Sequence, residues 1–282
     1  MTRAPLDRAS AVLGESPIRV RALPGGSVGQ VYRLDFAHRA SVVVKQDALH
    51  GRLDLEGWML QRLAPHLPVP GVLHAAPDLL IIGFLEGGGA VTPAAEEHAA
   101  DLLAGLHGVR GPHFGLERAT LIGALDQPND PSPLWVPFFR EYRLMHMARL
   151  AEKAGGLPEG CLARIDALAA RLEDILPEPA HPSLIHGDIW GGNVLVGGGR
   201  IAGFIDPALY HADPEIELAY TTMFHTFGPR FFARYQEHRP IRPGFFDERR
   251  EIYMLYPLLV HAALYGPGYG ASADWILRRR LG

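Results

Sequence analysis

The chain of 282 residues has only one cysteine and lacks any long apolar run. A single cysteine, Cys161, excludes an intrachain disulfide and fits a reducing compartment, so we expect a cytoplasmic protein. The longest apolar runs, 79–85 and 254–265, are too short or too interrupted to cross a bilayer. The first ten residues also lack the apolar centre of a signal peptide. These absences predict no association with a membrane.

Basic residues are not in excess either, because the formal net charge is −4. A protein that binds nucleic acid usually shows a basic patch or stripe, so we expect no nucleic-acid partner. The one basic cluster, Arg278–Arg280, is explained more simply as a solvated helix end, where cations interact favourably with the helix dipole. No G-x-x-x-x-G-K-S/T motif is present, which gives no support for a Walker-type nucleotide fold.

The most informative stretch is 184–206, which reads LIHGDIWGGNVLVGGGRIAGFID. It combines His186-x-Asp188 with Asn193 five residues after the aspartate and Asp206 at the end of an apolar segment. We expect the apolar segments before and after the glycine-rich loop to form two arms of one hairpin. A further arm, 200–205, would return Asp206 to the same edge.

Phosphoryl transfer from a nucleotide needs an acceptor for the proton of the attacking hydroxyl, a neutral oxygen ligand for magnesium and an anionic ligand beside it. Asp188, Asn193 and Asp206 can supply these three groups in that order. The alternative is that Asp188 and Asn193 only cap turns in a glycine-rich loop. The spacing of the whole set favours catalysis, with Asp188 as the catalytic base and Asn193 and Asp206 as metal ligands.

The N-terminal third contains residues suited to holding nucleotide phosphates. A glycine-rich turn, with Gly25, Gly26, Ser27 and Gly29, lets the backbone approach phosphates closely, although an ordinary hairpin turn would look similar. The strand 41–45 ends in Lys45, and Glu56 follows in a helix predicted over 53–63. A lysine at a strand end is usually only solvated, but this order favours Lys45 on the phosphates with Glu56 holding its ammonium group.

The buried strand predicted over 79–85 ends before three glycines that indicate a hinge between two lobes. Backbone groups of Gly83, Phe84 and Leu85 could pair there with the edge of an adenine. The segment 116–133 is expected to be a long functional loop, and the helices lie at 93–107, 134–154, 160–176 and throughout 215–281. We therefore predict an α+β, bilobal fold with a β-rich nucleotide-binding lobe (1–86) and a mainly helical lobe with the catalytic loop and substrate site (87–282).

These motifs resemble the fructosamine (ketosamine) kinase family, within the aminoglycoside phosphotransferase and choline kinase group of protein-kinase-like folds. The segment 186–193, HGDIWGGN, is similar to the family's H-G-D-L-W-x-G-N, and 204–210, FIDPALY, to its F-I-D-P-A-x-Y. Weaker agreement is found in Gly25-Gly26-Ser27, around Trp135 and in 256–269. The chain departs from the family's D-R-E-x-D-L-A pattern at Pro214 and Glu217.

The resemblance implies an ATP- and Mg²⁺-dependent kinase that phosphorylates O3 of a ketosamine, an activity of the protein-deglycation type. The partner would be a small ketosamine, a glycated amine or a glycated protein lysine, and we expect a monomer or weak homodimer. His186 is interpreted as a loop brace, Trp190 as stacking on the sugar or packing under the loop, and His261 as a core residue or a substrate contact. The other candidates on the substrate side are Asp213, Glu217, presumed to brace the catalytic loop, and Tyr265.

Two other functions stay open at this point. A kinase for an aminoglycoside, choline, homoserine or methylthioribose is disfavoured by Trp190 and by the Asp206-Pro207 pair. A nucleotide-binding pseudokinase with a regulatory role is disfavoured because Lys45, Glu56, Asp188, Asn193 and Asp206 are all intact.

Overall fold

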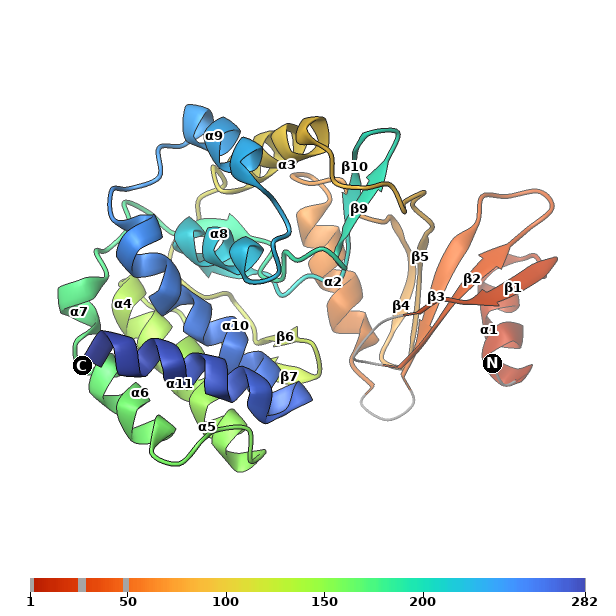
Figure 1. Ribbon diagram of the computed structural model, residues 1–282. Helices are drawn as coiled ribbons and strands as arrows, with labels where there is room; N and C mark the ends of the chain where they lie inside the picture. The colour runs from red at the N-terminus through yellow and green to blue at the C-terminus, as the bar shows by residue number, and fades with distance from the viewer. Residues whose placement is uncertain (1–2, 25–28, 48–50, 282) are drawn as a thin grey trace.

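The computed structural model describes residues 3–24, 29–47 and 51–281. Its N-terminal part is a five-stranded antiparallel sheet flanked by two helices (Figure 1). The strand order is β1-β2-β3-β5-β4. In chain order the elements are α1 (Arg3–Leu13), β1 (Arg19–Ala22), β2 (Gln30–Asp35), β3 (Val42–Gln46), α2 (Leu53–Leu63), β4 (Val72–Ala76) and β5 (Leu79–Gly83).

The strand β5 is apolar at nearly every position because both faces of the sheet are covered. Leu79 and Ile81 belong to a core that includes Ala9 of α1, whereas Leu80 and Ile82 pack with Leu53 and Leu60 of α2. Alternate side chains of a strand point to opposite faces, so the continuous run supplies both cores at once. Fully burying each such side chain contributes roughly 1.5–3 kcal/mol.

Helix α2 joins the sheet to the rest of the protein. Leu53 and Leu60 face the sheet, while Met59 and Leu63 belong to the large core of the C-terminal part. The apolar positions lie three and four residues apart, which gives the helix two adjoining apolar stripes. Glu56 is therefore held between two packed surfaces.

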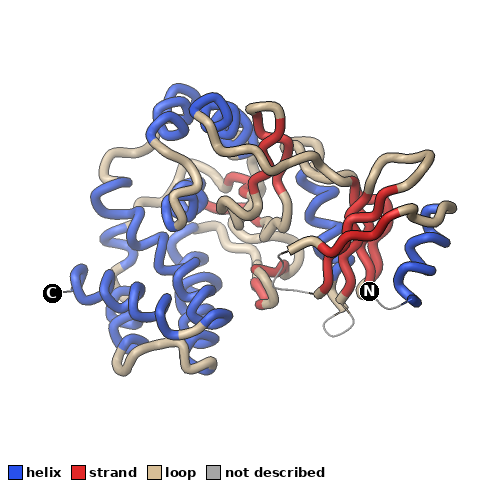
Figure 2. The backbone as a smooth tube through the Cα atoms, turned by 45° about the vertical axis from the view of Figure 1, so that its right-hand side comes forward, coloured by secondary structure: helices blue, strands red, loops and turns tan. Residues whose placement is uncertain are grey.

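The C-terminal part is mainly helical, with three small two-stranded sheets (Figures 1 and 2). No helix in the described ranges is long and apolar enough to cross a membrane. Its first half consists of α3 (Pro93–Leu106), β6 (Thr120–Ile122), β7 (Leu125–Gln127), α4 (Trp135–Phe138), the π-helical η1 (Phe139–Met145), α5 (His146–Lys153), α6 (Cys161–Ala169) and α7 (Leu172–Ile175). The second half consists of β8 (Ser183–Ile185), β9 (Val194–Gly197), β10 (Arg200–Phe204), β11 (Tyr210–Ala212), α8 (Pro214–Met223), α9 (Pro229–His238), the π-helical η2 (Phe245–Arg249), α10 (Arg250–Tyr265) and α11 (Pro267–Leu281).

The predicted α+β class is confirmed, and two local predictions are wrong. The strand before the catalytic loop, β8, pairs with β11 rather than with β9, whose partner is β10. The segment 116–133 is not a structureless loop but contains the hairpin β6–β7. It is ordered by buried amides: Gln127 Nε2 and Asn129 Nδ2 both donate to Thr120 Oγ1, at 2.7 and 2.8 Å. Arg278–Arg280 lie in the last turn of α11, as predicted for a helix end, and they also pair with acidic side chains.

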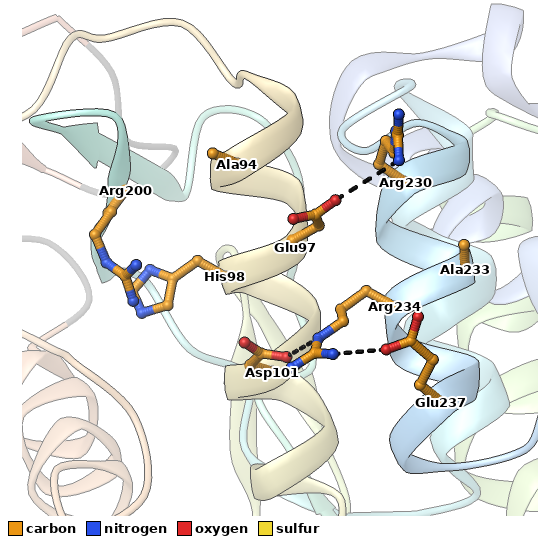
Figure 3. A pocket seen from close by; sticks show the side chains of 9 residues that line it. All are labelled: Ala94, Glu97, His98, Asp101, Arg200, Arg230, Ala233, Arg234 and Glu237. Atoms are coloured by element: carbon orange, nitrogen blue, oxygen red, sulfur yellow. Dashed lines mark hydrogen bonds and ion pairs between the residues drawn. The ribbon is translucent and has the colours of Figure 1, made fainter.

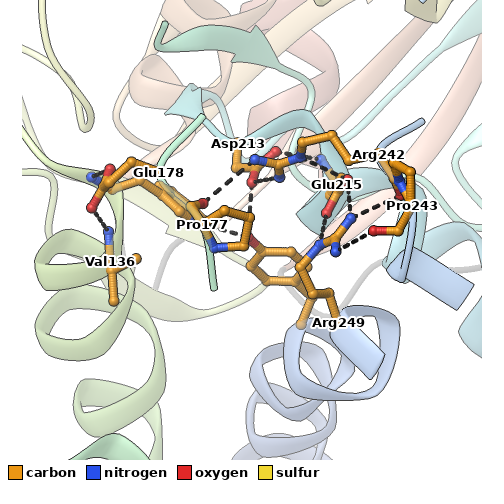
Figure 4. Close-up of polar contacts among 10 residues, drawn as sticks. Val136, Pro177, Glu178, Asp213, Glu215, Arg242, Pro243 and Arg249 are labelled. Carbon is orange, nitrogen blue, oxygen red and sulfur yellow. Dashed lines mark hydrogen bonds and ion pairs between the residues drawn. The ribbon is translucent and has the colours of Figure 1, made fainter. Parts of the chain in front are cut away.

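A buried ion-pair network ties the start of α8 to the segment before α10 (Figure 4). Glu215 Oε2 accepts from Arg249 Nε at 2.7 Å, and Glu215 Oε1 accepts from Arg249 Nη2 at 2.8 Å and from Arg242 Nε at 3.0 Å. Asp213 accepts from Arg242, from the Tyr253 hydroxyl at 2.8 Å and from the Glu215 N–H at 3.0 Å. Glu215 and Arg249 are both buried, so each charge depends on the other.

Replacing Glu215 by alanine should strongly destabilise the fold. The change leaves the Arg249 guanidinium buried without its carboxylate, and breaking a buried pair in this way costs about 3–5 kcal/mol. The free energy of unfolding, measured by urea titration, checks this. Asp101→Ala removes an ion pair with Arg234 that is exposed on both sides, and serves as a control with a far smaller loss. Equal losses in the two variants would contradict this role of Glu215.

Candidate active site

The catalytic loop brings Asp188 and Asn193 into direct contact. Asn193 Nδ2 donates to Asp188 Oδ2 at 2.8 Å and to the Asp188 carbonyl at 2.9 Å. Gly187 has a φ of +89°, and a Cβ there would lie 2.1 Å from the Ala208 carbonyl oxygen. Only glycine therefore fits between the loop and 207–209. The Asn193 amide fixes the orientation of the Asp188 carboxylate.

The buried Glu217 side chain braces this loop by a hydrogen bond. Its Oε1 accepts from the Gly187 N–H at 2.6 Å, and its Oε2 lies 2.8 Å from His107 Nε2. His107 Nδ1 in turn lies 2.7 Å from the Tyr235 hydroxyl. Hydrogen bonds to the carboxylate from His107 and from the loop lower the pKa of Glu217 despite its burial. The extra methylene of glutamate, compared with the family's aspartate, thus still permits contact with the loop.

Asp206 lies beside Asp188 and Asn193 and is linked through Lys45 to the N-terminal sheet. Lys45 Nζ donates to Glu56 Oε1 at 2.7 Å and also to Asp206 Oδ1. The two carboxylates outweigh burial and raise the pKa of Lys45, which keeps its ammonium group charged. The backbone of Asp206 is left-handed, with φ of 54°, and one third of its side chain is exposed (33%). Lys45 and Asp206 therefore share one site, although they are 161 positions apart in the sequence.

Burial raises the pKa of Asp188 to about 7. A hydrogen bond from Tyr220 opposes this shift, and the negative charge of nearby Asp206 adds to it. A carboxyl group with a pKa near neutrality is suited to exchange a proton with a substrate hydroxyl. The Ile205 N–H donates to the Asn193 carbonyl at 3.1 Å, which places Asp206 next to the loop that carries Asp188 and Asn193.

The structure restricts which of the groups predicted to bind the nucleotide are available to do so. Gly29 has a φ of +75°, and a Cβ there would overlap the Gln46 carbonyl oxygen at 2.0 Å. The strand β5 ends at Gly83, whose N–H donates to Gly71 O at 2.8 Å. The Phe84 N–H donates to Ser41 O at 3.1 Å, and its ring is covered by Arg33 at 3.8 Å.

The N–H groups of Gly83 and Phe84 are thus already used within the fold, and pairing of the other backbone groups of 83–85 with adenine stays a prediction. The Leu85 N–H makes no hydrogen bond with the part of the chain that the structure describes, and it remains a candidate. Gly25, Gly26 and Ser27 lie outside the described residues.

Trp190, two residues after Asp188, belongs to a cluster of aromatic side chains. The Trp190 ring is 39% exposed and lies 5.8 Å from the Phe224 ring, and Phe224 lies 5.2 Å from His261. His261 also contacts Tyr265 at 5.4 Å and Tyr269 at 4.9 Å, and its Nδ1 lies 2.8 Å from the Pro257 carbonyl. The predicted candidates Trp190, His261 and Tyr265 therefore belong to one aromatic cluster.

Sequence reasoning missed three residues of the site. Tyr220 and Phe224 are four positions apart at the end of α8, and this helical spacing could have revealed them. The Tyr220 hydroxyl lowers the pKa of Asp188, and Phe224 contacts both Trp190 and His261. His107 ends α3 far from any motif and could not have been found.

Three residues predicted on the substrate side are buried and bonded within the fold. His186 is fully buried, and its Nδ1 accepts from the Asp188 N–H at 3.3 Å, which agrees with a brace. Asp213 is buried in the ion-pair network of α8, where both carboxylate oxygens accept hydrogen bonds. Glu217 is likewise buried, as described above. These contacts hold the loop at 186–193 and the start of α8 in place.

A hollow between α3 and α9 is a further concave surface (Figure 3). Its charged side chains largely neutralise one another, because Arg234 pairs with Asp101 and Glu237 at 2.6 Å each, and Arg230 lies 3.9 Å from Glu97. We assign no site there.

Comparison with known proteins agrees with this geometry. The sequence profile described as fructosamine kinase matches residues 6–282. The chain is 30% identical over 274 residues to a probable ketoamine kinase of Enterococcus faecium, covering 94% of this chain and 97% of that protein. It is 32% identical over 280 residues to a probable ketoamine kinase of Synechocystis, covering 94% and 92%.

Solved structures give the same result. A Thermobifida fusca protein assigned as a fructosamine-3-kinase superposes with a TM-score of 0.89 at 28% identity, covering 100% of this chain and 99% of that one. An aminoglycoside phosphotransferase in ternary complex with AMP-PNP and hygromycin B has a TM-score of 0.68 at 18% identity, covering 98% and 99%, and shows the shared fold. The fold is thus protein-kinase-like, and the chain belongs to the fructosamine kinase family.

Proposed function

We propose that this protein is an ATP- and Mg²⁺-dependent kinase that phosphorylates the O3 hydroxyl of ketosamines. The observation that carries the proposal is the convergence of Asp188, Asn193 and Asp206: Asn193 bonds both Asp188 and the residue before Asp206, and Lys45 binds Asp206. The family membership supports the acceptor class, and a mouse relative, 35% identical over 167 residues, is named ketosamine-3-kinase.

Each of these residues would have a separate role in phosphoryl transfer. Asp188 is placed to accept the proton of the attacking hydroxyl, and Asn193 holds that carboxylate in one orientation. Lys45 offers a positive charge to the phosphates of ATP while Glu56 fixes its position. The glycines at 25–29 and the Leu85 backbone are proposed to contact the phosphates and the adenine.

The donor set fits a magnesium ion. Because the Asn193 amide nitrogen is used on Asp188, its amide oxygen remains as a ligand, and Asp206 adds an anionic oxygen. Magnesium prefers such hard oxygen donors and completes its shell with phosphate and water. When bound, it would neutralise charge on the transferring phosphoryl group.

The proposal is tested by incubating the protein with ATP, Mg²⁺ and a panel of fructosyl and ribulosyl amines. We expect ADP release that depends on the ketosamine, with phosphate on O3 by NMR. Aminoglycosides, choline, homoserine and methylthioribose serve as the comparison set. Turnover of one of these, with none of the ketosamines, would contradict the assignment, and nucleotide binding without any turnover would favour a pseudokinase.

The pH dependence of kcat/KM should report Asp188. The carboxylate form is needed to take a proton, and protonation as the pH falls through about 7 removes it. We therefore expect kcat/KM to rise with pH and level off above 7, because this parameter follows the free enzyme. Nucleotide affinity measured at the same pH values separates this effect from weaker ATP binding. A constant kcat/KM over about two pH units below neutrality would refute the base assignment.

A further inference from the structure

A groove of about 680 Å³ lies between the end of α8 and the helices α10 and α11. Its walls are largely apolar, with Met223, Met254, Leu258, Trp275 and Ile276 among the lining residues. Trp275 is exposed, which is unusual for so large an apolar side chain. The groove can therefore accept an aliphatic chain.

One part of the groove is formed by the aromatic cluster that contains Trp190, Phe224, His261 and Tyr269. Phe224 and Tyr269 line the groove, and both rings contact His261. Phe224 also contacts Trp190, which lies two residues after Asp188 in the catalytic loop. A molecule whose sugar is held beside Asp188 and Trp190 would extend its substituent along this groove.

One cation lines the groove without a partner. Arg250 Nε is buried and has no hydrogen-bond partner among the described residues, and its guanidinium forms no ion pair with any of them. The neighbouring acid, Glu251, does not neutralise it, because both its oxygens bind Arg279 and Arg280. A partly desolvated guanidinium favours an anionic ligand and matches the planar shape of a carboxylate.

We propose that this groove is the subsite for the amine portion of the ketosamine and that Arg250 binds a carboxylate at the far end of that portion. The preferred substrates would then be ketosamines of small amino acids with an apolar spacer between the nitrogen and the carboxylate. The inference rests on the function proposed above. It adds the class of amine, which the catalytic residues do not specify.

Three synthetic substrates of equal length test this inference. They are the 1-deoxyfructosyl derivatives of 6-aminohexanoate, of its amide and of hexylamine, compared by kcat/KM. We expect the carboxylate to be favoured over the amide by about tenfold to a hundredfold, the range for a hydrogen bond to a charged group. In Arg250→Gln the ratio of carboxylate to amide should fall to about one. Arg230→Gln, an exposed arginine outside the groove, is the matched control and should keep the full ratio.

The ratio is measured within one variant, so partial loss of folding cannot imitate the result. Equal kcat/KM for carboxylate and amide in the unmodified protein would overturn the subsite, while turnover of all three would leave the kinase assignment intact. An Arg250→Gln variant that keeps the preference would also overturn it. Absence of turnover on every derivative would instead refute the proposed function, and the subsite with it.

Discussion

Asp188→Asn should lower kcat by about two to four powers of ten, the range typical for loss of a general base. Asparagine has nearly the same shape and can still accept the hydrogen bond from Asn193 through its amide oxygen. What it lacks is the ability to take the proton of the sugar hydroxyl. Steady-state kinetics with a ketosamine and a coupled ADP assay measure the loss.

Nucleotide binding should be nearly unchanged in this variant, because Lys45 and Asp206 remain in place. The matched control is Asp166→Asn, the same change at an exposed position of α6, for which we expect normal turnover. Unimpaired kcat in Asp188→Asn would show that another group accepts the proton.

Asp206→Asn should abolish magnesium-dependent turnover, lowering kcat by roughly a thousandfold or more. The variant removes the only negative charge among the proposed metal ligands and weakens the contact with Lys45. Asparagine is the better replacement here than alanine, because the left-handed backbone of Asp206 suits asparagine and strains most other residues. The measured loss can then be attributed to charge rather than to backbone strain.

The control for Asp206→Asn is its thermal unfolding, which should stay close to that of the unmodified protein. A titration of activity against Mg²⁺ completes the test. If the variant reached normal kcat with an unchanged Mg²⁺ requirement, Asp206 would not be a metal ligand.

Much of this site could be predicted because its motifs are local in sequence. Helix α2 has the predicted bounds, 53–63, because apolar residues at helical spacing specify it despite Gly57 in its interior. The contact of Asp188 with Asn193 follows from a five-residue loop rich in glycine. The pairing of Lys45 with Glu56 was expected from the order of strand and helix.

The rest depends on contacts between distant segments. The pairing of β8 with β11 joins residues some 25 positions apart, and no local pattern distinguishes it from pairing with β9. The hairpin β6–β7 is held by Gln127 and Asn129, polar residues that by themselves indicate a loop. The π-helical turn at Phe139–Met145 interrupts a segment whose apolar spacing predicts one continuous helix. Burial of Asp213 likewise became evident only from its arginine and tyrosine partners.

The double anchoring of α2 has a consequence for regulation. Swinging this helix outward, to separate Glu56 from Lys45, would uncover Leu53 and Leu60 on one side and Met59 and Leu63 on the other. At roughly 1.5–3 kcal/mol for each side chain, such an inactive conformer would be rarely populated. The Lys45–Glu56 pair, proposed above to hold the phosphates, is thus assembled in the resting fold and would not need a switch in this helix to form.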